Sequence, residues 1–180
     1  MYIDYKLEGK YVTLRSVEES DAEFILSVRN DPRISKYLPP LNVTIKQQRE
    51  WISKQRADKD SFYFLWLSPT EEPIGTISLY NMDGNHSEMG RVCSIGEPAA
   101  NVEAFVLFLD FVFDYLKLDY TTGWVYEANK SVIALNNAFG MKWTTVGEDE
   151  GGNLYRNCIM TKDAYKGKRA NVLRKIRIKK

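Results

Sequence analysis

The chain has 180 residues with 44% hydrophobic and 27% charged side chains, a composition that suits one globular domain with a sizeable core and needs no second domain. Its formal net charge is +1, but eight basic and no acidic residues lie from Lys166 onward, which leaves the preceding part at a formal −7. The longest apolar run, residues 104–118, contains Asp110 and Asp114 and is too polar to cross a bilayer, and the N-terminus lacks the apolar segment of a signal peptide, so we expect a cytoplasmic protein.

The first half of the chain alternates between strand and helix patterns. Hydrophobic periodicity predicts a strand over 10–15, a helix over 18–29, a helix from 44 to about 56, and strands over 62–67 and 74–81. Thr44 with Gln47 three residues later is a capping-box pattern for the second helix. Between the two helices, three prolines within the segment PRISKYLPPLNV predict a structured loop of the kind that often borders a ligand site.

The second half of the chain continues the alternation. We predict a strand over 88–95, an apolar helix over about 101–116, a strand over 121–126, a helix over about 130–138, and strands over 142–146 and 154–161. Several neighbouring strands have hairpin-length connections, which favours a mixed, mostly antiparallel sheet. The crossover through the apolar helix requires one parallel pair.

The most informative stretch runs from Glu88 to Met141. A strand ends in the turn GEPAA, and an apolar helix follows directly, so the backbone N–H groups of its first turn lie beside the ends of two strands. Free N–H groups at a helix N-terminus are suited to binding a pyrophosphate. The next strand leads to Asn129, which is placed as the N-cap of another helix, and Gly140 is placed as its C-cap.

This order of motifs resembles the GNAT family of N-acetyltransferases. The segment GEPAANVEA stands where that family has a Q/R-x-x-G-x-G/A loop, and Asn129 leads to Ala-Phe-Gly-Met at the family's spacing. Pro98 removes one donor from the loop, and the glycine pattern is incomplete. Upstream, VRNDPRISKYL, EWI, PIGTISLYNMD and SEMG resemble the branch with ribosomal-protein acetylases and transferases acting on UDP-4-amino sugars. The likeness extends to about Lys162.

The resemblance implies an α+β GNAT fold with an about seven-stranded mixed sheet flanked by about four helices, in a domain of residues 1–165 followed by a basic tail of residues 166–180. It implies transfer of an acetyl group from acetyl-CoA to a primary amine. Backbone N–H groups around Cys93 to Ile95 are expected to polarise the thioester carbonyl. The residues expected to bind the coenzyme are Cys93, Ser94, Ile95, Gly96, Ala99, Ala100, Asn101, Val102, Asn129 and Asn136.

Amine acetylation needs a group that removes a proton from the acceptor. The match to family members favours Glu88, acting directly or through water, with His86 and Glu127 as alternatives. The family's usual tyrosine, which protonates the departing thiolate, is Asn136 here, and an amide cannot act as that acid. Tyr126 is the replacement that we predict.

The acceptor pocket is expected between the proline-bearing loop and the sheet, where Arg29, Tyr37, Trp51 and His86 are candidate contacts. The acceptor is either a nucleotide-linked amino sugar or a peptide N-terminus, and the upstream likeness slightly favours the sugar. An alternative is a catalytically silent acyl-CoA binder, which the incomplete glycine loop and Asn136 favour.

The remaining features predict no further cofactor. Cys93 and Cys158 have neither disulfide nor zinc-site spacing, and we interpret both as small core residues, with no metal site. The basic tail is expected to be solvated or partly helical, with Val172, Leu173 and Ile176 packing on the domain or on a second subunit of a homodimer. We expect no membrane partner. The net negative charge of the residues before Lys166 disfavours nucleic-acid binding.

Overall fold

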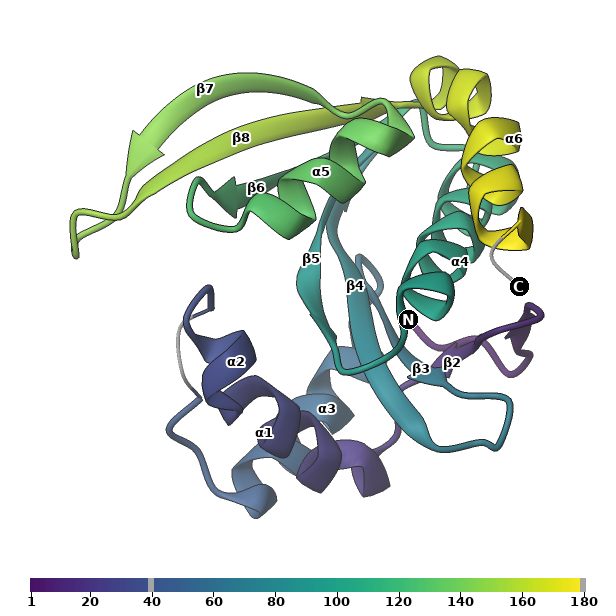
Figure 1. Ribbon diagram of the computed structural model, residues 1–180. Helices are drawn as coiled ribbons and strands as arrows, with labels where there is room; N and C mark the ends of the chain where they lie inside the picture. Colours follow the sequence, from purple (N-terminus) through teal and green to yellow (C-terminus); the bar gives the residue numbers. More distant parts are fainter. Residues whose placement is uncertain (39–40, 179–180) are drawn as a thin grey trace.

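The computed structural model describes residues 1–38 and 41–178 of the chain. Eight strands form a single sheet in the order β1-β2-β3-β4-β5-β6-β8-β7 (Figure 1). Every neighbouring pair is antiparallel except β5 and β6, which are parallel. The strands are β1 (Leu7–Glu8), β2 (Thr13–Ser16), β3 (Phe62–Leu67), β4 (Pro73–Asp83), β5 (His86–Ser94), β6 (Tyr120–Tyr126), β7 (Lys142–Glu148) and β8 (Leu154–Thr161).

Helices cover both faces of the sheet (Figure 1). One face carries α1 (Ala22–Asn30), the short α2 (Pro32–Ser35) and α3 (Ile45–Ala57). The other face carries α4 (Pro98–Asp110), which continues into a π-helical turn at Phe111–Tyr115, together with α5 (Lys130–Phe139) and α6 (Lys162–Ile178). Since β3 lies between the two layers, all six of its side chains are buried.

The core has two parts, one on each side of the sheet. The larger joins the sheet to α4, α5 and α6 and includes Phe64, Phe108 and Tyr165. The smaller lies beneath α1 and α3 and includes Ile25 and Ile52. The predicted mixed α/β fold is confirmed, with eight strands where about seven were expected and six α-helices among the described residues where about four were expected.

Local signals in the sequence account for several helix ends. The Thr44 side chain accepts from the Gln47 N–H and the Gln47 side chain accepts from the Thr44 N–H, so the predicted capping box is confirmed. Gly140 ends α5 at φ +87°, a left-handed conformation that glycine adopts without strain, as predicted. The proline-bearing segment differs from an irregular loop because the Asp31 side chain caps Pro32–Ser35 as a helix. Its residues 39–40 lie outside the described part of the chain.

The basic C-terminal segment continues the fold. Helix α6 begins at Lys162, so the expected boundary between residues 165 and 166 falls inside it. Tyr165, Val172 and Ile176 are buried against the domain, which is the packing that the spacing of the apolar residues allowed. The last two residues, 179–180, lie outside the described part. Across the described residues, none of the helices has the length and apolar character needed to cross a membrane.

Candidate active site

The parallel strands β5 and β6 separate after three residues of pairing. His86, Ser87 and Glu88 pair with residues 120–122 of β6. Beyond that point β5 continues along β4 as far as Ser94, while β6 continues along β8 as far as Tyr126. From residue 89 onward the described part of β5 therefore has no partner on its β6 side, and a wedge opens between the two strands.

A β-bulge at Arg91 marks the point where β5 bends. Arg91 has φ +52°, and the register with β4 shifts between Thr76 and Ser78. The Thr76 hydroxyl donates to the Arg91 carbonyl at 2.8 Å, and the Arg91 guanidinium donates to the Ser78 hydroxyl at 2.9 Å. The guanidinium also lies over the rings of Tyr80 and Trp51, at 4.4 and 5.0 Å from their centroids. These contacts hold a conformation that a non-glycine residue rarely adopts.

Gly123 lies at the narrow end of the wedge. A Cβ atom built on Gly123 would be 2.9 Å from the carbonyl oxygen of Met89. Real Cβ atoms do not approach a backbone oxygen so closely without displacement, so glycine lets β6 lie against β5 just where the strands separate.

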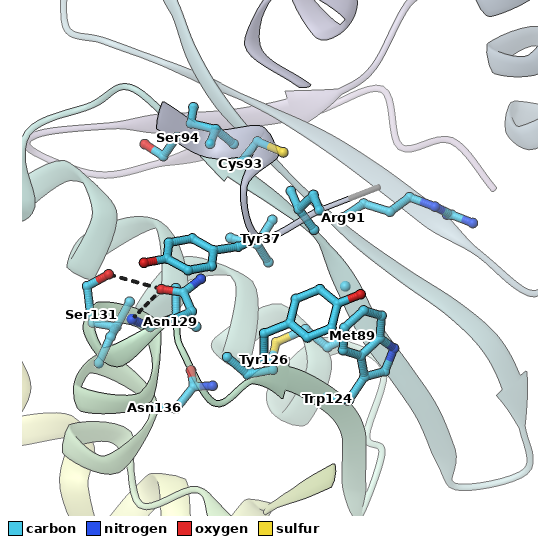
Figure 2. A pocket seen from close by; sticks show the side chains of 18 of the residues that line it. Tyr37, Met89, Arg91, Cys93, Ser94, Trp124, Tyr126, Asn129, Ser131 and Asn136 are labelled. Carbon is cyan, nitrogen blue, oxygen red and sulfur yellow. Dashed lines mark hydrogen bonds between the residues drawn. The ribbon is translucent and has the colours of Figure 1, made fainter. Parts of the chain in front are cut away.

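A cavity of about 350 Å³ occupies the wedge (Figure 2). Its walls come from β5, β6, α2, α5 and the first turns of α4. Seven predicted site residues line it: Tyr37, Cys93, Ser94, Asn101, Tyr126, Asn129 and Asn136. Figure 2 labels all of these except Asn101 and shows that they come from elements far apart in the sequence. The cavity is within the size range of small-molecule sites.

Helix α4 reaches this cavity at Asn101, and the turn just before Asn101 carries free donors. Pro98 is the first residue of α4 and has no N–H, and Asn101 is the first whose N–H bonds within the helix, to the Glu97 carbonyl at 3.0 Å. The N–H groups of Ala99 and Ala100 therefore have no acceptor within the helix. They lie at its positive end, where an anion is favoured.

The loop before α4 is held by side-chain hydrogen bonds. The Ser94 hydroxyl donates to Asn101 Oδ1 at 2.5 Å and accepts from the Gly96 N–H at 2.9 Å. The Asn101 amide in turn donates to the Gly96 carbonyl at 3.1 Å. The three residues fix the approach to the free N–H groups. The side chain of Val102, the residue after Asn101, is half-buried and packs against the core.

The expected row of free N–H donors at residues 93–95 needs one correction. The Ile95 N–H donates to the Ile74 carbonyl of β4 at 2.9 Å, so that donor is already used. Cys93, two residues earlier, pairs with Thr76, so its N–H also points toward β4. Because successive N–H groups of a strand point to opposite edges, the N–H of Ser94 is the one that faces the wedge.

The predicted base, Glu88, belongs to the last residue pair before the strands separate. Glu88 is half-buried and lies opposite Tyr80 of β4. The pKa of Tyr80 is raised, mainly because Tyr80 is buried and secondly because the negative charge of Glu88 is near. His86 is on the same face, where it bonds to the Thr122 hydroxyl at 2.9 Å and stacks on Tyr120. Among the described residues that line the wedge cavity, neither Glu88 nor His86 appears, although the neighbours Tyr80 and Met89 do.

The predicted acid, Tyr126, is engaged by a carboxylate. Its hydroxyl donates to Asp149 at 2.7 Å, and this bond raises the pKa of Tyr126. The same bond, aided by donors from Asn153 and Gly151, lowers the pKa of Asp149 to about 2. The Tyr126 proton is thus directed toward Asp149, which opposes its release to a thiolate.

A second cavity of about 570 Å³ adjoins the first. It lies between the segment at Ser35–Leu38 and the turn that joins β7 to β8, and it shares Tyr37, Leu38 and Tyr126 with the wedge cavity. Two carboxylates line it, those of Asp149 and Glu127. The Asp149 carboxylate accepts from Tyr126, as described above, and the Glu127 carboxylate pairs with Arg156 at 2.6 Å. A molecule in this cavity would meet a molecule in the wedge at Tyr126.

Besides His86, two predicted acceptor contacts are absent from the lining of both cavities. Trp51 on α3 packs edge-on against Tyr63. Arg29, in the last turn of α1, is close enough to lower the pKa of Cys93, although burial dominates and raises that pKa to about 11. Cys93 and Cys158 are buried free thiols, which confirms the interpretation of both as core residues. In the described ranges, no group of three or more metal-binding side chains is present.

Several lining residues were not predicted from the sequence. Arg33, Ile34 and Leu38 reach the wedge cavity from α2 and the turn after it, and Trp124 reaches it from β6. Trp124 carried a usable signal, since the two-residue period of a strand places it on the same face as Tyr126. The signal for helix α2 was weaker: Asp31 followed by Pro32 is a pair that can begin a helix.

Known proteins of similar sequence and structure were then compared with the chain. A family model described as an acetyltransferase (GNAT) domain matches residues 12–142. No curated protein matches by sequence. Among solved structures, apo FdhC, described as a nucleotide-linked sugar GNAT, has a TM-score of 0.79 and 27% identity over 96% of this chain and 98% of its own.

Two further solved structures resemble the fold at lower identity. A GCN5-related N-acetyltransferase from Brucella melitensis has a TM-score of 0.75 and 16% identity, covering 97% of this chain and 85% of its own. Spermidine N-acetyltransferase from Vibrio cholerae, in complex with CoA and spermine, has a TM-score of 0.76 and 19% identity, covering 88% of this chain and 99% of its own.

Proposed function

Because the chain belongs to the GNAT family of acetyltransferases, we propose that its acceptor is the primary amine of a nucleotide-linked amino sugar. Membership of the family makes the chain an acetyl-CoA-dependent N-acetyltransferase. The proposal concerns the acceptor and the residues that serve each step.

The wedge suits the pantetheine arm and diphosphate of acetyl-CoA. The free N–H groups of Ala99 and Ala100 supply donors for the diphosphate, and the unpaired edge of β5 supplies the Ser94 N–H for an amide or thioester carbonyl. Asn129 holds the opposite wall, because its side chain caps α5 by accepting from Val132 at 3.3 Å. When bound, acetyl-CoA supplies an activated acyl group.

We assign the removal of the proton from the acceptor amine to Glu88. It lies on the face of the sheet that carries α1, α2 and α3, one residue before the strands part. Because Glu88 is not among the residues that line the wedge cavity, proton transfer through an intervening water is favoured. Neither Asn136 nor Tyr126 is then needed as an acid, since a thiolate is a tolerable leaving group.

One observation carries the choice of acceptor: the carboxylates of the second cavity are already satisfied within the chain. Glu127 is paired with Arg156, and Asp149 accepts from Tyr126, Gly151 and Asn153. A polyamine needs carboxylates that are free to pair with its ammonium groups, so this cavity is poorly suited to one.

The cationic and aromatic side chains at the cavity entrance favour a phosphate-bearing ligand. Lys36 and Tyr37 line the second cavity, with the Lys36 ammonium 4.7 Å from the centre of the Tyr37 ring. The half-exposed Trp124 lines the adjoining wedge, as does Arg33, whose guanidinium pairs with the Asp31 carboxylate at 2.6 Å. Ammonium and guanidinium groups bind phosphate, and aromatic faces stack on nucleotide bases. The likeness to FdhC, described as a nucleotide-linked sugar GNAT, supports the same choice.

An acceptor panel tests this proposal. The protein is incubated with acetyl-CoA and, separately, UDP- and dTDP-linked amino sugars, spermidine and an N-terminal peptide, and thiol release and product mass are recorded. We expect acceptor-dependent thiol and an acetylated product with a nucleotide sugar. Turnover of spermidine or of the peptide instead would reject the acceptor class, and CoA binding without any turnover would favour a silent binder.

A paired substitution locates the acceptor. Lys36→Ala is expected to raise KM for the nucleotide sugar while leaving KM for acetyl-CoA unchanged, because Lys36 lines only the second of the two cavities described. Lys46→Ala, at an exposed position of α3, is the matched control. Equal KM values for the two variants would remove Lys36 from the acceptor site.

A further inference from the structure

The hydroxyl of Tyr80 lies over β5, although Tyr80 itself belongs to β4. A Cβ atom built on Gly90 of β5 would be 2.5 Å from the Tyr80 hydroxyl oxygen, and 3.2 and 3.3 Å from Cε1 and Cζ of the ring. These atoms belong to the far end of the side chain, so the ring reaches across to β5 with its hydroxyl end leading. Glycine at residue 90 leaves the space that this end occupies.

This orientation brings Tyr80 to the wedge. Tyr80 and Gly90 both line the wedge cavity, although β5 lies between β4 and the wedge in the order of the sheet. Because the side chain of Tyr80 starts on the far side of β5, its hydroxyl end is the part nearest the wedge. The residue is half-buried. A molecule in the cavity can therefore meet the hydroxyl.

Glu88 shares this face of the sheet with Tyr80. The two residues pair across β4 and β5, and Gly90 is two residues beyond Glu88, so all three lie on one face. Two residues of a strand span about 6.5 Å, a distance that the Glu88 side chain and one water can bridge. Glu88 does not line the wedge cavity, whereas Tyr80 does. Tyr80 thus presents a hydroxyl to the cavity from beside a carboxylate that does not line it.

The surroundings of Tyr80 hold its ring and keep its hydroxyl neutral. The Arg91 guanidinium lies 4.4 Å from the centre of the ring, which restricts the movement of the ring. Burial, and secondly the charge of Glu88, raise the pKa of Tyr80 from its ordinary value, while the charge of Arg91 lowers it. The hydroxyl therefore keeps its proton at neutral pH. In contrast to the Tyr126 hydroxyl, it donates to no carboxylate of the described residues.

We propose that the Tyr80 hydroxyl binds the acceptor amine and relays its proton, through water, to Glu88. The inference rests on the proposed function and adds a catalytic residue to it. An N–H bond of the acceptor ammonium breaks as its proton moves to the Tyr80 oxygen, and the proton of the hydroxyl moves through the water to the Glu88 carboxylate. Tyr80 is thus neutral before and after the transfer. The neutral nitrogen then bonds to the acyl carbon, the C–S bond breaks with its electron pair going to sulfur, and the proton that the nitrogen sheds neutralises the thiolate.

Tyr80→Phe tests the relay, because it removes the hydroxyl and keeps the ring beside Arg91. With the amine that the wild-type protein acetylates in the acceptor panel, we expect kcat to fall roughly 10²-fold, while calorimetry still detects CoA binding. Gly90→Ala, which keeps the hydroxyl but fills its place, is expected to lower kcat as well. Tyr63→Phe is the matched control: Tyr63 is on the same face of β3, is buried and lines neither of the two cavities described, so its kcat should match that of the wild type.

Coupling to Glu88 separates a relay from a structural role. If both side chains serve one proton path, the double variant of Tyr80→Phe and Glu88→Gln turns over no more slowly than Glu88→Gln alone. Losses that multiply in the double variant, or a wild-type kcat in Tyr80→Phe or Gly90→Ala, would overturn the inference and leave the proposed function standing. A wild-type protein that acetylates none of the amines in the panel would reject both.

Discussion

The hydrogen bond between Tyr126 and Asp149 sets the ionisation of both side chains. It lowers the pKa of Asp149 from the ordinary 3.8 to about 2. Since the folded pKa is depressed, the turn between β7 and β8 gains stability from the ionised Asp149 above about pH 4, and loses it as the pH falls through about 2. Around neutral pH, the arrangement keeps Tyr126 protonated and held at the junction of the two cavities.

Tyr126→Phe is expected to raise the pKa of Asp149 toward 3.8, because the largest cause of its depression is removed. The rise should be partial, since Gly151 and Asn153 still donate to the carboxylate. Carboxyl ¹³C signals followed through an acid titration measure this. An unchanged midpoint in the variant would show that Tyr126 does not hold the carboxylate in solution.

Glu88→Gln tests the proposed base. Removing a positioned general base typically lowers turnover by about 10²- to 10⁴-fold, and we expect kcat to fall in this range while the Kd for CoA stays the same, since Glu88 does not line the wedge cavity. His86→Asn tests the alternative base on the same face of β5, two residues away. Turnover unaltered by the Glu88 change would remove the assignment.

Some of these site residues could be predicted from the sequence, and others could not. Asn129 and Gly140 are caps, whose chemistry is local, so their positions followed from the pattern alone. The Ile95 N–H was expected to be a free donor, but it bonds to the Ile74 carbonyl, because strand register decides which edge each N–H faces. Arg33 and Leu38 could not be predicted as lining residues, because only the fold brings α2 and the turn after it to the wedge.

Helix α6 is joined to α4 by a polar contact at the edge of the core. Asp110 accepts from the buried Tyr165 hydroxyl at 2.8 Å and from two nitrogens of Arg169, at 2.8 and 2.6 Å. The carboxylate raises the pKa of both partners, although burial is the larger cause for Tyr165. This contact explains why a segment that reads as a basic tail is a packed helix.

Asp110→Ala is expected to lower the free energy of unfolding by about 1.5–3 kcal/mol, because the Tyr165 hydroxyl and the Arg169 guanidinium lose a charged acceptor, although the hydroxyl keeps the Val106 carbonyl at 3.1 Å. Asp114→Ala is the matched control, since Asp114 pairs with Lys166 at a half-exposed position, where such pairs contribute about 0–1 kcal/mol. Urea denaturation measures both. Equal losses would show that the Asp110 contact is no stronger than a surface ion pair.

The close approach of β6 to β5, at the point where the two strands separate, depends on Gly123. Gly123→Ala places a Cβ atom against the Met89 carbonyl and is expected to destabilise the fold by about 1–3 kcal/mol. Gly167→Ala is the contrasting control, since nothing lies within 4 Å of the added atom in α6, and it should stabilise by about 0.5–1 kcal/mol. Thermal unfolding distinguishes the two, and a neutral Gly123 variant would show that the strands tolerate displacement there.

For the molecule as a whole, the order of strands and helices was largely predictable from periodicity and turn residues, as was the mixed sheet with one parallel pair. The short β1 and helix α2 were not, because two or four residues carry too little periodicity. The second cavity was also beyond prediction, since it forms between α2 and a turn more than 100 residues later. Such a site exists only once both segments are placed by the fold.

The central claim is that the wedge and the N-terminus of α4 together bind an acyl-CoA. Residue-resolved hydrogen exchange with and without CoA tests it most directly, because the Ala99 and Ala100 N–H groups lack acceptors within their helix. The account predicts that saturating CoA slows exchange at Ala99, Ala100 and Ser94, with little change in α6. Exchange at these three residues that is identical with and without CoA would contradict it.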